Sequence, residues 1–308
     1  MADWALAHAA DYRCRRLKSN QVQAPQVSVS ALCVYPVKST RGIAREHVSL
    51  TATGFEWDRQ WMIVDSRGVF LSQRTHPQLA RIVPEVTARA LLLSAPGLPT
   101  LSVSLDTEGA RLAVRVWDDA CVGIDEGGEA EGWVTRAVGE PVRLVRVAPD
   151  MERLANPEFA GASPAPLGFP DGYPILVCNE SSLADLNTRL PQRIPMERFR
   201  PNIVLRGLPA WAEDHIDTLC FGAVTLRLVK PCTRCVIPSI DQASGVRSTD
   251  PLPALREFRF SRQLRGVMFG ENAVIVTGAG GQIARGAPVE ATYESGFGGP
   301  PAPAGNNV

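Results

Sequence analysis

Short segments in which apolar residues alternate with polar ones dominate the first half of this chain. Residues 27–32, 101–105 and 112–117 each carry apolar side chains at every second position. Such alternation is typical of β-strands that bury one face. No succession of strands and helices is long enough for a doubly wound parallel sheet. We therefore predict a mostly β (α+β) fold that is barrel-like, with helices at its periphery.

The remaining elements follow from turn and capping residues. The turn Ser66-Arg67-Gly68 separates residues 60–65 from 69–72, which predicts a β-hairpin. Helices are predicted over 129–138, with Gly139 as the C′ residue, over 253–264, and in a short segment with Ser182 as its N-cap. Further strands are predicted at 142–147, 175–178, 202–206, 223–229, 274–277 and 288–293.

Changes in composition divide the chain into regions. Residues 1–26 are polar and predict an irregular leader, in which residues 2–12 either form a short helix or stay disordered. A Pro/Ala/Gly-rich stretch at 156–172 predicts a linker or long loop, and the Gly/Pro-rich residues 294–308 predict a disordered tail. The predicted regions are listed here: leader 1–26, N-terminal β domain 27–150, linker 151–172, second domain 173–293, tail 294–308.

Charge and cysteine usage narrow the class of protein. The 32 Lys+Arg residues balance the 32 Asp+Glu residues, which argues against nucleic acid or a membrane surface as the main partner. We expect no membrane span and no signal peptide, because no apolar run is long enough. The seven cysteines are an odd and scattered number, several in apolar runs. This usage indicates a reducing compartment, and we predict a cytoplasmic location.

The thiol pair Cys232 and Cys235 is the most informative motif of the chain. It follows the strand-like residues 224–229, with cations at Lys230 and Arg234 beside it. A thiolate in such surroundings is a soft ligand for a transition metal. A structural zinc site would need a second thiol pair, which the sequence lacks. A redox dithiol or two buried structural thiols remain open on the residues alone.

Three basic segments offer sites for an anion. Lys38, Ser39, Arg41 and Gly42 follow a strand end and could cradle an anion or form a solvated turn. In an extended chain Arg198, Arg200 and Asn202 would share one face; the alternative is a charged edge strand paired with Glu197 or Asp185. Arg59 either pairs with Asp58 or points into a site at the start of the next strand.

Taken in order, seven segments resemble the MOSC family with its N-terminal β-barrel domain, and most closely the mitochondrial amidoxime-reducing component and its bacterial homologues. The segments are residues 34–39, 58–59, 182–187, 198–202, 232–235, 269–272 and 286–289. The resemblance spans about residues 29–293. It implies a MOSC β-barrel preceded by a MOSC-associated β-rich domain, with molybdenum cofactor (a molybdopterin carrying molybdenum) between them.

The resemblance also implies a role for each matching residue. Cys235 matches the cysteine that ligates molybdenum, so Cys232 becomes a neighbouring or merely packed thiol. The positions that match cofactor contacts are Lys38, Ser39, Arg59, Ser182, Arg200, Asn202, Thr233 and Arg234. Three positions depart from the family pattern: Glu180 and Ala287 replace a common Asp, and His215 replaces an expected aromatic residue.

The implied activity is a two-electron reduction of small N-oxygenated compounds, such as amidoximes, N-hydroxylated bases and hydroxylamines. No Gly-rich dinucleotide fingerprint, haem motif or four-cysteine block follows in the sequence. The electrons would therefore come from a separate flavin, haem or iron–sulfur protein. The alternatives are a non-catalytic carrier of the cofactor or a sulfur-transfer protein, and a metal-free dithiol redox protein.

Overall fold

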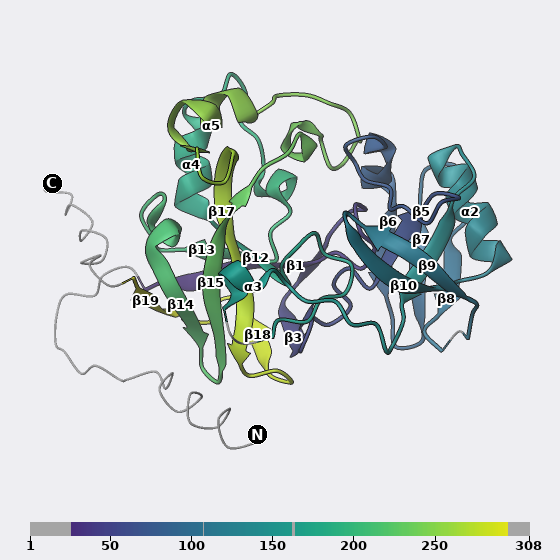
Figure 1. Cartoon of the computed structure of the whole chain (residues 1–308). Helices are drawn as coiled ribbons and strands as arrows, with labels where there is room; N and C mark the ends of the chain where they lie inside the picture. Colours follow the sequence, from purple (N-terminus) through teal and green to yellow (C-terminus); the bar gives the residue numbers. More distant parts are fainter. Residues whose placement is uncertain (1–25, 107, 162–163, 295–308) are drawn as a thin grey trace, which may run out of the picture.

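The computed structural model describes residues 26–106, 108–161 and 164–294 (Figure 1). The predicted helix at 2–12 and all but the first residue of the predicted tail lie outside these residues. Strands greatly outnumber helices in the described part, so the predicted mostly β class is confirmed. Within the same part, no helix has the length and apolar character that crossing a membrane requires.

A nine-stranded mixed sheet forms the larger unit, on the left of Figure 1. Most of its strands carry the Val, Ile and Leu residues that favour a pleated, buried surface. In spatial order they are β19 (Glu290–Tyr293), β14 (Ile216–Phe221), β15 (Val224–Thr233), β17 (Gly266–Thr277), β12 (Ile175–Asn179), β13 (Ile203–Arg206), β1 (Ser28–Val34) and β2 (Ile43–Arg45), with β16 (Phe260–Ser261) paired to β17. Among the described strands of this sheet, β12 and β13 pair in parallel and the other neighbours pair antiparallel.

The smaller unit, on the right of Figure 1, holds two antiparallel sheets and a helix. One sheet has the order β5 (Trp61–Val64), β11 (Arg143–Val147), β10 (Asp119–Asp125), β9 (Arg111–Val116); the other has the order β6 (Val83–Val86), β7 (Ala90–Ser94), β8 (Leu101–Ser104). Helix α2 (Gly128–Val138) buries Trp133 and Val134 against them. Gly139 ends α2 in the left-handed conformation at φ 94°, as predicted.

Strands from the first part of the predicted N-terminal domain join the larger unit. Strand β1 pairs with β13, and β3 (His47–Thr51) pairs with both β4 (Gly54–Phe55) and β18 (Gln282–Ala284). Val29, Leu50 and Phe55 pack in one core with residues 175–289. Strands β1, β3 and β4 of the predicted N-terminal domain therefore contribute to the core of the larger unit, whereas Val37 between them packs in the core of the smaller unit.

Several predicted elements need correction. The hairpin at 60–72 is reduced to β5 and single bridges at Val69 and Phe70. The helix predicted over 253–264 is only α5 (Leu252–Phe258), because Phe260 and Ser261 turn to pair with β17. The other helices are short: α3 (Pro157–Ala160), α4 (Glu180–Asn187), and the 3-10 helices η1 (Pro77–Arg81), η2 (Met196–Phe199), η3 (Ala212–His215) and η4 (Ile237–Ser239).

Candidate functional site

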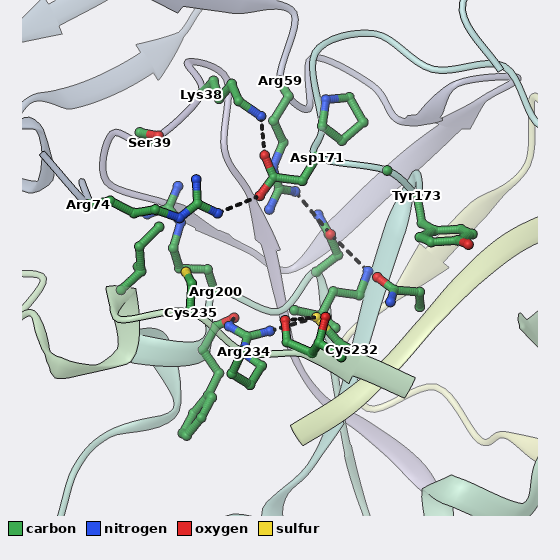
Figure 2. A pocket seen from close by; sticks show the side chains of 18 residues that line it. Lys38, Ser39, Arg59, Arg74, Asp171, Tyr173, Arg200, Cys232, Arg234 and Cys235 are labelled. Atoms are coloured by element: carbon green, nitrogen blue, oxygen red, sulfur yellow. Dashed lines mark hydrogen bonds and ion pairs between the residues drawn. The ribbon is translucent and has the colours of Figure 1, made fainter. Parts of the chain in front are cut away.

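A pocket of about 150 Å³ lies where the two units meet, and it collects side chains from both (Figure 2). The smaller unit and its connections provide Lys38, Ser39, Arg59 and Arg74. The larger unit provides the end of β15 and the segment before β13. The remaining lining residues are Pro170, Asp171, Gly172, Tyr173, Leu176, Phe199, Arg200, Asn202, Cys232, Thr233, Arg234, Cys235, Ile237 and Asn272.

The lining is strongly cationic. Among these residues, five carry a positive charge and Asp171 alone carries a negative one. A second carboxylate, Asp58, is buried behind Arg59. Even when both carboxylates are counted, five cations against two anions leave a surplus of three positive charges. A concave site with one sign of charge attracts the opposite sign, so this pocket is suited to an anionic ligand.

Lys38 and Asp171 form the ion pair at one wall (Figure 2). Lys38 is 5% exposed, and its Nζ donates to Asp171 Oδ1 at 2.5 Å and to the Phe169 carbonyl oxygen at 2.9 Å. Burial lowers the pKa of Lys38, against the attraction of Asp171. Burial raises the pKa of Asp171, but the charge and hydrogen bond of Lys38 outweigh it and hold that pKa well below its usual range. Asp171 keeps 58% of its side-chain surface accessible because it faces the pocket.

Arg59 is fixed between a carboxylate and an amide. Its Nη1 donates to Asp58 Oδ2 and, at 3.0 Å, to Asn202 Oδ1. Burial raises the pKa of Asp58 despite the attraction of Arg59. Both alternatives that the sequence left open are thus realised, because Arg59 pairs with Asp58 and also lines the pocket.

Three of the seven non-glycine residues with positive φ in the described part of the chain line the pocket. Ser39 (φ 67°), Arg59 (φ 49°) and Arg200 (φ 57°) are non-glycine residues in the left-handed region, and all three line the pocket. Such conformations cost about 1–3 kcal/mol each and persist only where the surroundings enforce them. They are typical of positions at which a side chain must be aimed, so they support a functional role for this pocket.

Arg200 is held by two neighbours that belong to different segments. Its Nη1 donates to the Thr40 carbonyl oxygen at 2.6 Å and to Gln242 Oε1 at 3.1 Å. Gln242 in turn exchanges two hydrogen bonds with Gln73, at 2.9 and 3.0 Å, and both amides are buried. This amide pair fastens the segment after Cys235 to the smaller unit.

The two thiols lie on the lower side of the pocket in Figure 2, and neither is disulfide-bonded. Cys232 is the penultimate residue of β15, and its Sγ accepts a hydrogen bond from Arg234 Nη1 at 3.0 Å. Arg234 Nη2 donates to the Phe199 carbonyl oxygen at 2.6 Å, and its buried Nε has no hydrogen-bond partner within the described residues. Both thiols are partly exposed, and both line the pocket.

The structure brings eight of the nine residues predicted as site residues to this pocket: Cys235, Lys38, Ser39, Arg59, Arg200, Asn202, Thr233 and Arg234. The ninth, Ser182, does not line it. Ser182 is fully buried, donates to Glu213 Oε2 at 2.8 Å and accepts from the Trp211 backbone N–H at 2.8 Å. It is not the N-cap of its helix either, because Asn179 accepts the capping hydrogen bond from the Ser181 N–H.

The predicted common face of Arg198, Arg200 and Asn202 is wrong. Residues Met196–Phe199 form a 3-10 helix, and the left-handed Arg200 reverses the chain after it. Arg198 does not line the pocket and pairs with Asp241 at 3.3 Å, and not with Glu197 or Asp185. Only Arg200 and Asn202 line the pocket.

Sequence reasoning missed several lining residues, among them Arg74, Asp171, Tyr173 and Asn272. Asp171 lies in the stretch that was predicted to be a linker. Its signal was the turn sequence Phe-Pro-Asp-Gly-Tyr-Pro at 169–174, in which a lone carboxylate stands among rigid residues. Arg74 carries no local signal, because only the fold brings it to within 3.8 Å of Asp171.

Comparison with known families identifies both parts of the chain. The family described as the MOSC N-terminal beta barrel domain matches residues 26–141, and the family described as the MOSC domain matches residues 164–290. Residues of both matched regions line the pocket, and those of the second region include residues 170–173 near its start.

Curated relatives are about one-third identical to this chain over the aligned residues. Mitochondrial amidoxime reducing component 2 of Bos taurus is 32% identical over 75% of this chain and 72% of its own length. Mitochondrial amidoxime-reducing component 1 of Homo sapiens is 33% identical with the same coverage. The component 1 protein of Mus musculus is 30% identical over 88% of this chain and 82% of its own length.

Proposed function

Because this chain belongs to the MOSC family together with the amidoxime-reducing components, we propose that it is a molybdenum-cofactor-dependent reductase of N-oxygenated compounds. The substrate class we propose comprises amidoximes, N-hydroxylated bases and hydroxylamines. The observation that carries the proposal is the convergence of eight predicted residues, from Lys38 to Cys235, on one cationic pocket. They come from segments almost two hundred residues apart in the sequence.

The pocket suits an anionic, sulfur-rich cofactor on three grounds. It has a surplus of positive charge, which a phosphate group would neutralise. The buried Nε of Arg234 has no partner within the described residues, and such an unpaired donor is costly unless a ligand satisfies it. The pocket also offers accessible thiols, and thiolates are soft ligands for a transition metal.

The residues divide by what they would do for the bound cofactor. Arg59 and Arg200 are fixed donors that would bind and orient its anionic end, and Lys38 would add a further positive charge. Cys235 would supply the protein thiolate to the metal, and Arg234 would help to keep the thiol region anionic. When bound, the cofactor supplies the two-electron redox chemistry that removes oxygen from an N–O bond.

The proposal requires a partner for electrons. The sequence carries no Gly-rich dinucleotide fingerprint or haem motif, so we propose an external flavin, haem or iron–sulfur protein as the donor. The names of the relatives place those proteins in mitochondria. The cytoplasmic location predicted from this sequence stays a prediction.

The test is to express the full chain in cells that make molybdenum cofactor and to measure bound molybdenum and pterin. We expect about one metal per chain, and turnover of benzamidoxime to benzamidine with a reduced dye as electron source. Well-folded protein that carries no molybdenum would contradict the proposal.

The ligand assignment is tested by a matched pair of variants. Cys235→Ser should lower turnover by at least roughly 100-fold, because residues that only support a metal ligand are already worth about 10- to 100-fold. Cys232→Ser makes the same chemical change three residues away and should keep most of the activity. The opposite result would assign the metal to Cys232, the thiol that Arg234 contacts.

A carrier or sulfur-transfer protein would need the same pocket without turnover. It would hold molybdenum and pterin but yield no amine from an N-hydroxylated base and reduced dye. A metal-free dithiol protein would instead show a reversible disulfide between Cys232 and Cys235 and no pterin fluorescence after denaturation.

A further inference from the structure

Tyr35 lies against both of the arginines that face the pocket centre. The guanidinium carbon of Arg59 is 4.3 Å from the centroid of the Tyr35 ring, and that of Arg200 is also 4.3 Å from it. Tyr35 is 2% exposed and does not itself line the pocket. One buried phenol ring therefore supports two cations that stand 141 positions apart in the sequence.

The same residue also ties the two backbone segments that carry these arginines. The Tyr35 N–H donates to Asp58 Oδ1 at 2.8 Å, and the Arg59 N–H donates to the Tyr35 carbonyl oxygen at 2.8 Å. At its other end, the Tyr35 hydroxyl donates to the Pro201 carbonyl oxygen at 3.2 Å. Burial raises the pKa of Tyr35 well above its usual value, so the hydroxyl stays a neutral donor.

The Tyr35 ring can stabilise the two neighbouring guanidinium groups. Two guanidinium groups held in a buried region repel one another and lose hydration, which disfavours keeping both in place. The electron-rich face of an aromatic ring attracts cations, most strongly where water is excluded. A phenol in contact with both groups therefore offsets part of their repulsion and limits where each can point.

The neighbouring backbone leaves room for the ring. A Cβ atom at Gly42 would lie 2.5 Å from Tyr35 Cε1 and 2.5 Å from Cys33 Sγ. Only glycine therefore lets the chain pass this close to the ring. The position of Tyr35 is thus fixed from three sides, by Gly42, by the Asp58–Arg59 segment and by Pro201.

We propose that Tyr35 is a positioning residue whose ring holds Arg59 and Arg200 in the arrangement that binds the anionic ligand of the pocket. The inference rests on the proposed function only in that the pocket takes an anion. It requires no metal and no turnover, so it can be tested on the protein without cofactor.

The test uses the full chain purified without cofactor and inorganic phosphate as the probe, with the dissociation constant measured by calorimetry. Tyr35→Phe keeps the ring and loses the hydroxyl, and we expect phosphate affinity within about threefold of the parent. Tyr35→trifluorophenylalanine has nearly the same shape but an electron-poor ring. We expect its affinity for phosphate to be about tenfold lower than that of Tyr35→Phe, since the attraction to both guanidinium groups is lost.

A purely structural role predicts a different result. If the ring only filled space, fluorination would leave phosphate affinity unchanged, and equal affinities would overturn the proposal. A parent protein that binds no phosphate would overturn it as well. Tyr35→Leu, which removes the ring, should bind at least as weakly as the fluorinated variant.

A matched control separates anion binding from stability. Phe221 is 6% exposed in β14 and does not line the pocket, so Phe221→Leu should destabilise the protein while phosphate affinity stays that of the parent. The proposed function can fail separately from the role of Tyr35. In that case the parent binds phosphate, and the fluorinated variant binds it more weakly, while the parent acquires no molybdenum in competent cells. That result would refute the reductase and leave the role of Tyr35 intact.

Discussion

The substitution of Lys38 separates what a buried charge contributes to stability from what it contributes to anion binding. The substitution Lys38→Met keeps the aliphatic stem and removes the charge. It deletes two hydrogen bonds, to Asp171 Oδ1 and to the Phe169 carbonyl oxygen, and a contact with the Phe70 ring at 4.7 Å. Asp171 would keep Arg74 at 3.8 Å and a hydrogen bond from Trp117 Nε1 at 3.2 Å.

The expected change in stability is small. Hydrogen bonds from a charged donor are worth about 1.5–3 kcal/mol each. Burying an ammonium group costs several kcal/mol, which largely cancels that gain. The lowered pKa of Lys38 indicates that burial prevails over the attraction of Asp171. We therefore expect Lys38→Met to change the free energy of unfolding by less than about 1.5 kcal/mol.

The expected change in anion binding is larger. Two unit charges 4 Å apart interact by about 1 kcal/mol in bulk water and about 4 kcal/mol near a protein surface. A pocket open to solvent lies between these limits, so the loss of one cation should weaken phosphate binding roughly 10- to 100-fold. A charge retained at little or no benefit to stability, yet needed for the ligand, is a functional charge.

Urea unfolding monitored by circular dichroism and calorimetry with inorganic phosphate measure the two quantities. Lys230→Met is the matched control, because this lysine lies in β15 near the thiols without lining the pocket. A Lys38→Met protein that is destabilised by more than about 3 kcal/mol and still binds phosphate like the parent would refute the reasoning. The parent should also gain stability as pH rises toward 10.5, since the unfolded chain then binds more protons, and the variant should not.

Two further predictions concern groups around the pocket. Burial, reinforced by Asp214 and Glu213, raises the pKa of Glu271 well above its usual value. The folded state then binds more protons than the unfolded chain, so the stability of the parent falls as pH rises above about 4.5. Glu271→Gln should therefore be more stable than the parent at pH 8 but not at pH 4, as measured by thermal unfolding. Gln73→Leu and Gln242→Leu should each lower the free energy of unfolding by about 1–3 kcal/mol, because each leaves a buried amide unpaired. The double substitution should lower it by less than the sum of the two. Strict additivity in a double-mutant cycle would contradict a coupled pair.

Local pattern predicted the elements whose neighbours are close in sequence. The structure places β1, β8 and β9 within a residue or two of the predicted bounds. Strands β8 and β9 alternate as predicted, whereas a shift of register between Val29 and Ala31 interrupts the alternation in β1. Helix α2 and its left-handed Gly139 followed from composition and capping alone. These features depend on backbone conformation and on a single buried face, both of which the local sequence encodes.

Features that depend on distant partners could not be predicted in this way. The α5 helix stops at Phe258 because the following residues pair with β17. Serine is a favoured N-cap residue, but the Ser182 hydroxyl donates a hydrogen bond to Glu213, which lies thirty-one residues further along the chain. Arg198 and Arg200 are separated by one residue, yet the left-handed Arg200 lines the pocket while Arg198 pairs with Asp241.

The sequence by itself determined the mostly β class, the family, and the basic and thiol residues that could serve an anionic cofactor. Only the tertiary structure decided which of them meet. It brought Lys38, Arg59 and Arg200 together with the thiols, added Asp171 and Arg74, and left Ser182 outside. It also placed Tyr35 against two of the cations. The physical reason is that charge and chemical type belong to each residue, whereas burial, distance and mutual repulsion exist only between residues that the fold has brought together.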